Sequence, residues 1–101
     1  MWAAAPELLK DEEYGRSQDT WSLGCILFYM ITLQHPFGSL TDKKFAKNVV
    51  TKEPNFDLIP AGYELSKKML KKMLIKDGNK RPKLADLFPE LKEVVIKLLE
   101  K

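Results

Sequence analysis

One long apolar run dominates the pattern of hydrophobic and polar positions along the chain. Residues 19–33 read DTWSLGCILFYMITL, and no charged side chain follows Asp19 within this run. As a helix, the run would extend about 22 Å at the usual rise per residue. A helix that is apolar all round is either buried on every side or spans a membrane, and a span needs around 20 apolar residues. The run is shorter than that, so the pattern predicts a central helix that other elements cover on all sides.

Two segments after this run show the periodicity of amphipathic helices. Residues 41–52 place Phe45 and Val49 on one face, with lysines elsewhere. Residues 64–75 place five leucine and methionine side chains on one stripe. The intervening residues, 53–62, contain two prolines and two turn-forming residue types, which predicts a loop.

The last part of the chain is predicted to form two helical pieces. Residues 83–88 form a short one, and Pro89 is expected to end it. Residues 90–101 then carry leucines and valines on one stripe, which predicts an extra C-terminal amphipathic helix. No segment alternates in the manner of a half-buried strand. We therefore predict an all-α fold in a single domain.

Composition and charge narrow the class of protein only a little. The chain has 101 residues, of which 45% are hydrophobic and 31% charged, and a net charge of +3. These values are ordinary for a soluble globular domain and do not by themselves indicate a nucleic-acid or membrane partner. The single cysteine, Cys25, excludes an internal disulfide and fits a reducing compartment. Because no secretory signal follows Met1, we expect the protein to be located in the cytoplasm or nucleus.

Four short motifs occur in a fixed order along the chain. They are Ala-Pro-Glu at 5–7, Asp-Thr-Trp-Ser-Leu-Gly at 19–24, Pro-Phe at 36–37 and Asp-Gly-Asn-Lys-Arg-Pro at 77–82. Their order and spacing resemble the C-terminal half of the large lobe of eukaryotic protein kinases, of the serine/threonine type. The resemblance runs from Ala5 to about Phe88 and implies that residues 1–101 form a partial kinase domain. The implied fold is the helical subdomain of the kinase C-terminal lobe, an incomplete kinase-like fold around one buried central helix.

The resemblance implies a structural ion pair between Glu7 and Arg81. In the family, the glutamate of Ala-Pro-Glu pairs with the arginine ahead of the last short helices. A planar guanidinium can hold a carboxylate through two parallel hydrogen bonds, which would tie the end of the activation segment to the helices. The alternative is that both charges are solvated separately.

The resemblance also assigns roles within the central helix. Asp19 matches the aspartate that supports the catalytic loop through hydrogen bonds, although it could equally serve as a helix N-cap. Trp21 matches the tryptophan that packs near the Glu7–Arg81 pair. Ile26 and Met30 fall where the family's central helix forms the base of the apolar stack beneath the adenine. Plain core packing is the alternative for Ile26 and Met30.

No catalytic, cofactor-binding or metal-binding residue is predicted in this chain. The glycine-rich loop, the strand lysine, the His-Arg-Asp loop and the Asp-Phe-Gly motif of kinases do not occur in it. ATP and Mg²⁺ are implied for a complete kinase only. His35 and Cys25 show no catalytic or metal-ligand spacing, so we expect His35 to be structural or solvated and Cys25 to be a buried, inert thiol.

Three functional interpretations follow. The first is a fragment of a serine/threonine kinase whose complete form transfers the ATP γ-phosphate to protein hydroxyls. The second is a non-catalytic, pseudokinase-like module that binds proteins. The third, a nucleic-acid-binding module based on the lysines of residues 67–83, is disfavoured because no aromatic side chains are interleaved with them. Expected partners are the remainder of the kinase domain and protein substrates or regulators at residues 39–52. We also expect apolar surface from Phe28, Tyr29 or Leu33 and self-association of the isolated chain.

Overall fold

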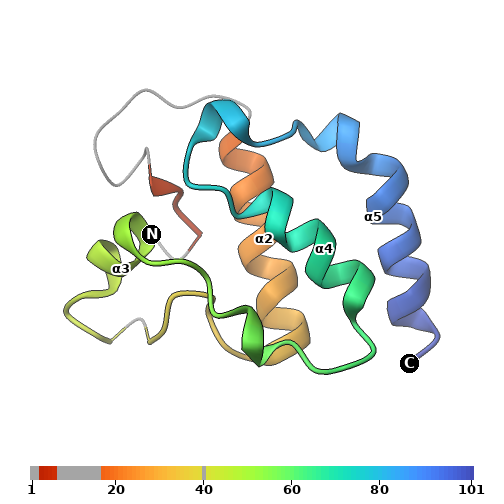
Figure 1. The fold of residues 1–101 in the computed structure, drawn as a ribbon, viewed down its shortest axis with the longest axis horizontal. Helices are drawn as coiled ribbons and strands as arrows, with labels where there is room; N and C mark the ends of the chain where they lie inside the picture. The colour runs from red at the N-terminus through yellow and green to blue at the C-terminus, as the bar shows by residue number, and fades with distance from the viewer. Residues whose placement is uncertain (1–2, 7–16, 40) are drawn as a thin grey trace.

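The described part of the chain is built from helices joined by turns. The computed structural model describes residues 3–6, 17–39 and 41–101 (Figure 1). The helices are α2 (Ser17–Thr32), α3 (Phe45–Thr51), α4 (Glu64–Met73) and α5 (Leu84–Leu99), and the 3₁₀ turns are η1 (Phe56–Leu58) and η2 (Gly78–Lys80). No strand occurs in these described ranges. The predicted all-α class is therefore confirmed.

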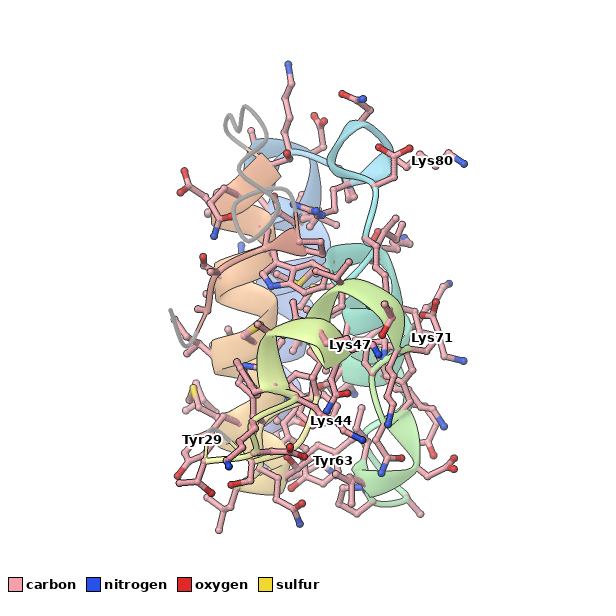
Figure 2. All side chains as sticks on the ribbon, turned by 90° about the vertical axis from the view of Figure 1, so that its left-hand side faces the viewer. Tyr29, Lys44, Lys47, Tyr63, Lys71 and Lys80 are labelled. Carbon is pink, nitrogen blue, oxygen red and sulfur yellow. The ribbon has the colours of Figure 1, made fainter. Side chains whose placement is uncertain are left out.

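Three of the helices pack against one another. α2 lies behind α4 in Figure 1 and packs chiefly against it, and α5 contacts both of them. α3 lies on the opposite side of α2 from α5 (Figure 1). Turning the molecule by 90° separates α2, on the left, from α4, on the right (Figure 2).

The prediction that α2 is covered on all sides is wrong for this chain. One face carries the buried side chains, namely Thr20, Trp21, Gly24, Cys25, Leu27 and Phe28. On the other face, Ile26, Met30 and Leu33 are 45%, 66% and 73% exposed. The reason is that α4 and α5 pack against one face of α2, while no element of the described chain covers the other. We call this second face, formed by Ile26, Tyr29, Met30 and Leu33, the open face.

A glycine sets the close approach of α2 and α4. A Cβ atom on Gly24 would lie 3.0 Å from Cδ2 of Leu74 and 3.1 Å from Cβ of Met73. These separations are shorter than ordinary van der Waals contact, so a side chain at this position would force the helices apart. Gly24 thus positions α4 against the buried face of α2.

The segment before α3 differs from the sequence prediction. A helix was expected over residues 41–52, but α3 begins at Phe45. Polar side chains bind the backbone ahead of it: Oδ1 of Asp42 accepts from the amide of Lys44 at 2.8 Å, and the Ser39 hydroxyl accepts from the amide of Thr41 at 3.2 Å. Such local bonds compete with helix formation and favour turns.

The predicted break at Pro89 is also wrong, because α5 runs without interruption from Leu84 to Leu99. Proline removes its own amide donor, which would have bonded to the carbonyl of Ala85, and its ring crowds that carbonyl. Ala85 is exposed, so water can satisfy its carbonyl. There is therefore no separate helix over residues 90–101, although the predicted amphipathic stripe is present in the second part of α5, where Val94 is buried.

Candidate functional site

The candidate site is the joint between the start of α2 and the end of α4, where a buried arginine binds main-chain carbonyls. Arg81 follows η2 and is only 5% exposed. Its Nη1 donates to the carbonyl of Ser17 at 3.0 Å, its Nη2 to that of Lys76 at 3.0 Å, and its Nε to that of Ile75. Hydrogen bonds from a charged donor are stronger than neutral ones. We call this arrangement the Arg81 joint.

Aromatic rings form the apolar side of the Arg81 joint. The guanidinium carbon of Arg81 lies 5.0 Å from the ring centroid of Trp21, within the range of a cation–π contact. Trp21 is fully buried and stacks on Phe37, with ring centroids 5.6 Å apart and an interplanar angle of 7°. The positive charge of Arg81 is thus held between carbonyl oxygens and an aromatic face.

Lys76 connects the Arg81 joint to α3. Its Nζ donates to the carbonyl of Val49 at 2.7 Å and lies 4.5 Å from the ring centroid of Phe37. Burial lowers the pKa of Lys76, and the nearby carboxylate of Glu53 opposes this shift. The hydrogen bond from Lys76 to Val49 therefore links α3 to the segment that follows α4.

The first turns of α2 hold the segment that precedes Pro6. Oε1 of Gln18 accepts from the amide of Ala5 at 3.0 Å, and its Nε2 donates to the carbonyl of Ala3 at 3.1 Å. The hydroxyl of Ser22 donates to the same carbonyl at 2.9 Å. These bonds fix the backbone of residues 3–5 against α2, and we call them the Gln18 clamp.

A third contact ties α2 to the segment after Arg81. The hydroxyl of the buried Thr20 donates to the carbonyl of Pro82 at 2.8 Å. Sequence reasoning missed Gln18, Ser22 and Thr20. The available signal was their position: Gln18 and Ser22 are four residues apart on one face of an otherwise apolar helix, which is unusual unless they have polar partners.

Comparison with known proteins identifies the family. The family model of the protein kinase domain matches residues 1–91, which is most of the chain. The chain belongs to the protein kinase family. The motif-based prediction of a segment of a serine/threonine kinase is thereby confirmed, since two of the relatives below are named serine/threonine-protein kinases.

The kinase relatives are much longer than this chain. The serine/threonine-protein kinase Nek10 of Mus musculus is 32% identical over 100 residues, which cover 97% of this chain and 9% of that protein. The serine/threonine-protein kinase Nek3 of Oryza sativa subsp. japonica is 35% identical over 95 residues, covering 92% of this chain and 16% of that protein. Cyclin-dependent kinase-like 2 of Rattus norvegicus is 36% identical over 106 residues, covering 99% of this chain and 20% of that protein. The kinase chain thus spans between 9% and 20% of these relatives' length.

The site residues predicted from the kinase resemblance have different environments. Glu7 lies outside the described residues, so its ion pair with Arg81 stays a prediction. Asp19 is exposed beside the buried Thr20, and the catalytic loop that it was predicted to support has no counterpart in the sequence. That role also stays a prediction.

Of the three residues predicted to pack from the central helix, only Trp21 is buried. Ile26 and Met30 lie on the open face, where nothing in the described chain covers them. They do not pack in the core of this chain, because the face that they share points away from α4. Their predicted place beneath the adenine of a complete kinase domain stays a prediction.

His35 and Cys25 are in structural positions. Nδ1 of His35 accepts from the amide of Phe37 at 3.1 Å, and its ring meets that of Phe45 edge-on with centroids 4.7 Å apart. Burial raises the pKa of the Cys25 thiol to about 12, with Arg81 opposing the shift, so the thiol stays protonated at neutral pH. A protonated, buried thiol is a poor nucleophile.

A complete protein kinase uses ATP with Mg²⁺. The described residues contain no group of three histidine, cysteine, aspartate or glutamate side chains that could hold a metal ion. The sequence also lacks the family's phosphate-binding and metal-binding motifs. Separately, none of the described helices combines the length and the apolar character that crossing a membrane requires.

Proposed function

We propose that this chain forms the helical platform of a serine/threonine kinase C-terminal lobe. The complete domain transfers the ATP γ-phosphate to serine and threonine hydroxyls of intracellular proteins, and the platform supports the segment that ends in Ala-Pro-Glu. The observation that carries this proposal is the Gln18 clamp, because it fixes the backbone of residues 3–5 to the same helix that Arg81 joins to α4.

The platform acts by positioning and performs no chemical step itself. In phosphoryl transfer, catalysis comes almost entirely from placement and electrostatic stabilisation of the reacting groups. A displacement of 1 Å in a supporting element can lower the rate about a hundredfold. The Gln18 clamp restrains the backbone of residues 3–5 directly. The Arg81 joint restrains α2, the helix to which these residues are bound.

Exposed residues of α2 fit contacts with the rest of the kinase domain. Asp19 would bind the backbone of the catalytic loop, and Ile26 and Met30 would lie beneath the adenine-side apolar stack. Their exposure in this chain supports such roles, since each is available for a partner. The buried Arg81 is likewise proposed to accept Glu7 as its carboxylate partner.

Residues 39–52 are proposed as a docking region for protein substrates or regulators. Lys43, Lys44 and Lys47 are exposed around the start of α3, while Phe45 anchors the segment in the core. The three positive charges are therefore presented to solvent by a segment that Phe45 holds against the core.

A chimeric kinase tests the platform proposal. The matching part of the kinase domain of the rice relative would be replaced with this chain, and transfer of radiolabelled phosphate from ATP to serine/threonine peptides would be measured. We expect a folded chimera that phosphorylates these peptides and not tyrosine-only peptides. Gln18→Ala should lower the rate about tenfold or more, because it releases residues 3–5.

Gln34→Ala is the matched control for this assay. Gln34 is exposed beyond the other end of α2 and takes part in hydrogen bonds through its backbone atoms. A folded chimera without activity, or equal losses from both substitutions, would contradict the proposal.

A second candidate function is a non-catalytic protein-interaction module. The open face of α2 favours it, because apolar side chains are exposed on a chain whose sequence lacks the catalytic motifs. An inactive but folded chimera, together with binding of proteins through this face, would support this candidate.

A further inference from the structure

We propose that a pocket beside the end of α4 binds an acidic peptide segment of a protein partner, with one apolar side chain of that segment inserted into the pocket. The pocket has a volume of about 460 Å³. Its lining residues are Glu53, Phe56, Lys71, Leu74, Ile75, Lys76, Asp77 and Lys80. We call it the lysine pocket. The proposal goes beyond the function proposed above, since peptide binding here requires no phosphoryl transfer.

Apolar side chains form part of the lysine pocket. Leu74 is 2% exposed and belongs to the core, and Ile75 and Phe56 are half-buried beside it. Ligand sites combine such apolar walls with a few polar groups that fix orientation. A leucine-sized side chain from a partner would bury apolar area on both sides of the contact.

Two lysines supply charge at the rim. Lys71 and Lys80 are exposed, and Nζ of Lys71 lies 5.8 Å from the ring centroid of Phe56. The ion pairs between described residues join Lys72 to Glu90 and Lys97 to Glu100. None of these four residues lines the pocket. Lys76, by contrast, already donates to Val49.

Further exposed lysines lie at the start of α3, outside the pocket. Figure 2 shows Lys71 and Lys80 along the edge formed by α4 and the turn after it, with Lys44 and Lys47 nearer the centre of the view. All four are exposed. The carboxylates of a peptide whose apolar anchor enters the pocket would meet the exposed Lys71 and Lys80 at its rim, which favours binding and accelerates association.

Acidic residues in the lining favour a peptide over a nucleic acid. Oδ1 of Asp77 accepts from the amide of Asn79 at 3.0 Å, and Glu53 lies near Lys76. These carboxylates interrupt the positive surface and would repel a continuous chain of phosphates. A peptide can place uncharged residues opposite them. The pocket also offers a single half-buried aromatic ring, Phe56, whereas single-stranded nucleic acids use several stacking rings.

Fluorescence anisotropy with the 101-residue chain tests the proposal. The probe is a fluorescein-labelled ten-residue peptide in which two leucines are flanked by aspartates and glutamates. We expect saturable binding that weakens with added salt. The double variant Lys71→Glu/Lys80→Glu should lower the affinity about tenfold or more, because both rim charges are reversed.

The matched control is Lys83→Glu/Lys92→Glu, which makes the same change in net charge at exposed positions outside the pocket. Its affinity should stay within about twofold of the unmodified chain. Circular dichroism establishes that both variants keep their helices. Equal losses in the two double variants would overturn the proposal, since they would show non-specific attraction.

Altered peptides test the same proposal on the unmodified chain, whatever the variants do. Replacing the leucines with serine, or the acidic residues with lysine, should each lower the affinity about tenfold or more. If the serine peptide bound as tightly as the original peptide, the proposed insertion of an apolar side chain would be wrong. Absence of binding by the original peptide, or tighter binding of a ten-nucleotide single-stranded DNA through Lys71 and Lys80, would overturn the proposal as a whole.

Discussion

At the scale of single residues, Leu33 ends α2 in the left-handed conformation. Its φ is 61°, and its amide donates to the carbonyl of Tyr29 at 2.7 Å. Glycine commonly occupies such a position after a helix, because Cβ crowds the following carbonyl in every other L-residue. Thr32 and Gln34 stabilise the turn around it, through the Thr32 hydroxyl.

Leu33→Gly should therefore stabilise the chain. The left-handed conformation costs a residue with a Cβ about 1–2 kcal/mol, and the greater freedom of glycine in the unfolded chain offsets part of the gain. We expect the free energy of unfolding in urea to rise by about 0.5–1 kcal/mol. Leu33→Ala is the matched control, since it removes the exposed side chain but keeps Cβ, and it should give no gain. Equal stabilities of the two variants would contradict this account.

Cys25 makes stability depend on pH in the alkaline range. Burial raises the pKa of its thiol from 9.0 to about 12. The folded state holds this proton more tightly than the unfolded state, so the contribution is complete below pH 9 and is lost as the pH rises toward about 12. The difference in unfolding free energy between the unmodified chain and Cys25→Ala should shrink by up to about 1.4 kcal/mol per pH unit in that range.

Urea unfolding of both proteins at about pH 8 and about pH 10.5 measures this difference. The lowered pKa of Lys76 acts in the opposite direction, but it is common to the two proteins and cancels from the comparison. A difference that does not change with pH would show that the thiol titrates normally.

At the scale of elements, Arg81 joins the start of α2 to the residues that follow α4. Arg81→Ala would leave the carbonyls of Ser17, Ile75 and Lys76 without their donor, and a buried unsatisfied polar group costs about 1–3 kcal/mol. We expect the free energy of unfolding to fall by about 3 kcal/mol, measured in urea. Arg81→Lys should recover only part of this loss, because an ammonium cannot reproduce the planar fork. An unchanged unfolding midpoint would contradict the importance of the joint.

The same measurement tests the predicted pair with Glu7. If the two side chains interact, the losses from Glu7→Ala and Arg81→Ala will not add in the double variant. If the two losses in unfolding free energy were additive, the two side chains would not interact.

Much of the helical framework was predictable, but several boundaries were not. The runs at 19–33 and 64–75 correspond to α2 and α4 because their apolar patterns are long and regular. The start of α3 was missed because the side chain of Asp42 binds the backbone locally, which periodicity does not record. The continuity of α5 was missed because the cost of Pro89 depends on whether the carbonyl of Ala85 is exposed.

The candidate site was predictable only where a motif marks it. Arg81 and Trp21 were found through the kinase resemblance. Gln18 and Ser22 were missed because their partners, the backbone groups of residues 3–5, lie more than a dozen positions away in the sequence. A long-range contact of this kind leaves no local pattern, and backbone partners leave no residue type to search for.

At the scale of the whole molecule, we expect the open face of α2 to govern behaviour in solution. Exposure was expected at Phe28, Tyr29 or Leu33, and the structure shows it at Tyr29 and Leu33, whereas Phe28 is fully buried against the core. Apolar patches of this kind promote association. The isolated chain should therefore self-associate at micromolar concentrations.

Met30→Glu/Leu33→Glu should lower the average mass measured by light scattering, because charge replaces apolar area at the two most exposed positions of the open face. Ala46→Glu/Thr51→Glu is the matched control, which adds the same charge at exposed positions of α3 and should leave association unchanged. A sharp monomeric profile of the unmodified chain would contradict the expectation.

The Arg81 joint has a consequence for mutational tolerance. Arg81 binds the backbone oxygens of Ser17 and Ile75, and every amino acid supplies such an oxygen. Positions 17 and 75 should therefore tolerate many residue types without weakening the joint, whereas position 81 should tolerate almost no replacement. A library randomised at all three codons and selected for folding should return diverse residues at 17 and 75 and arginine at 81.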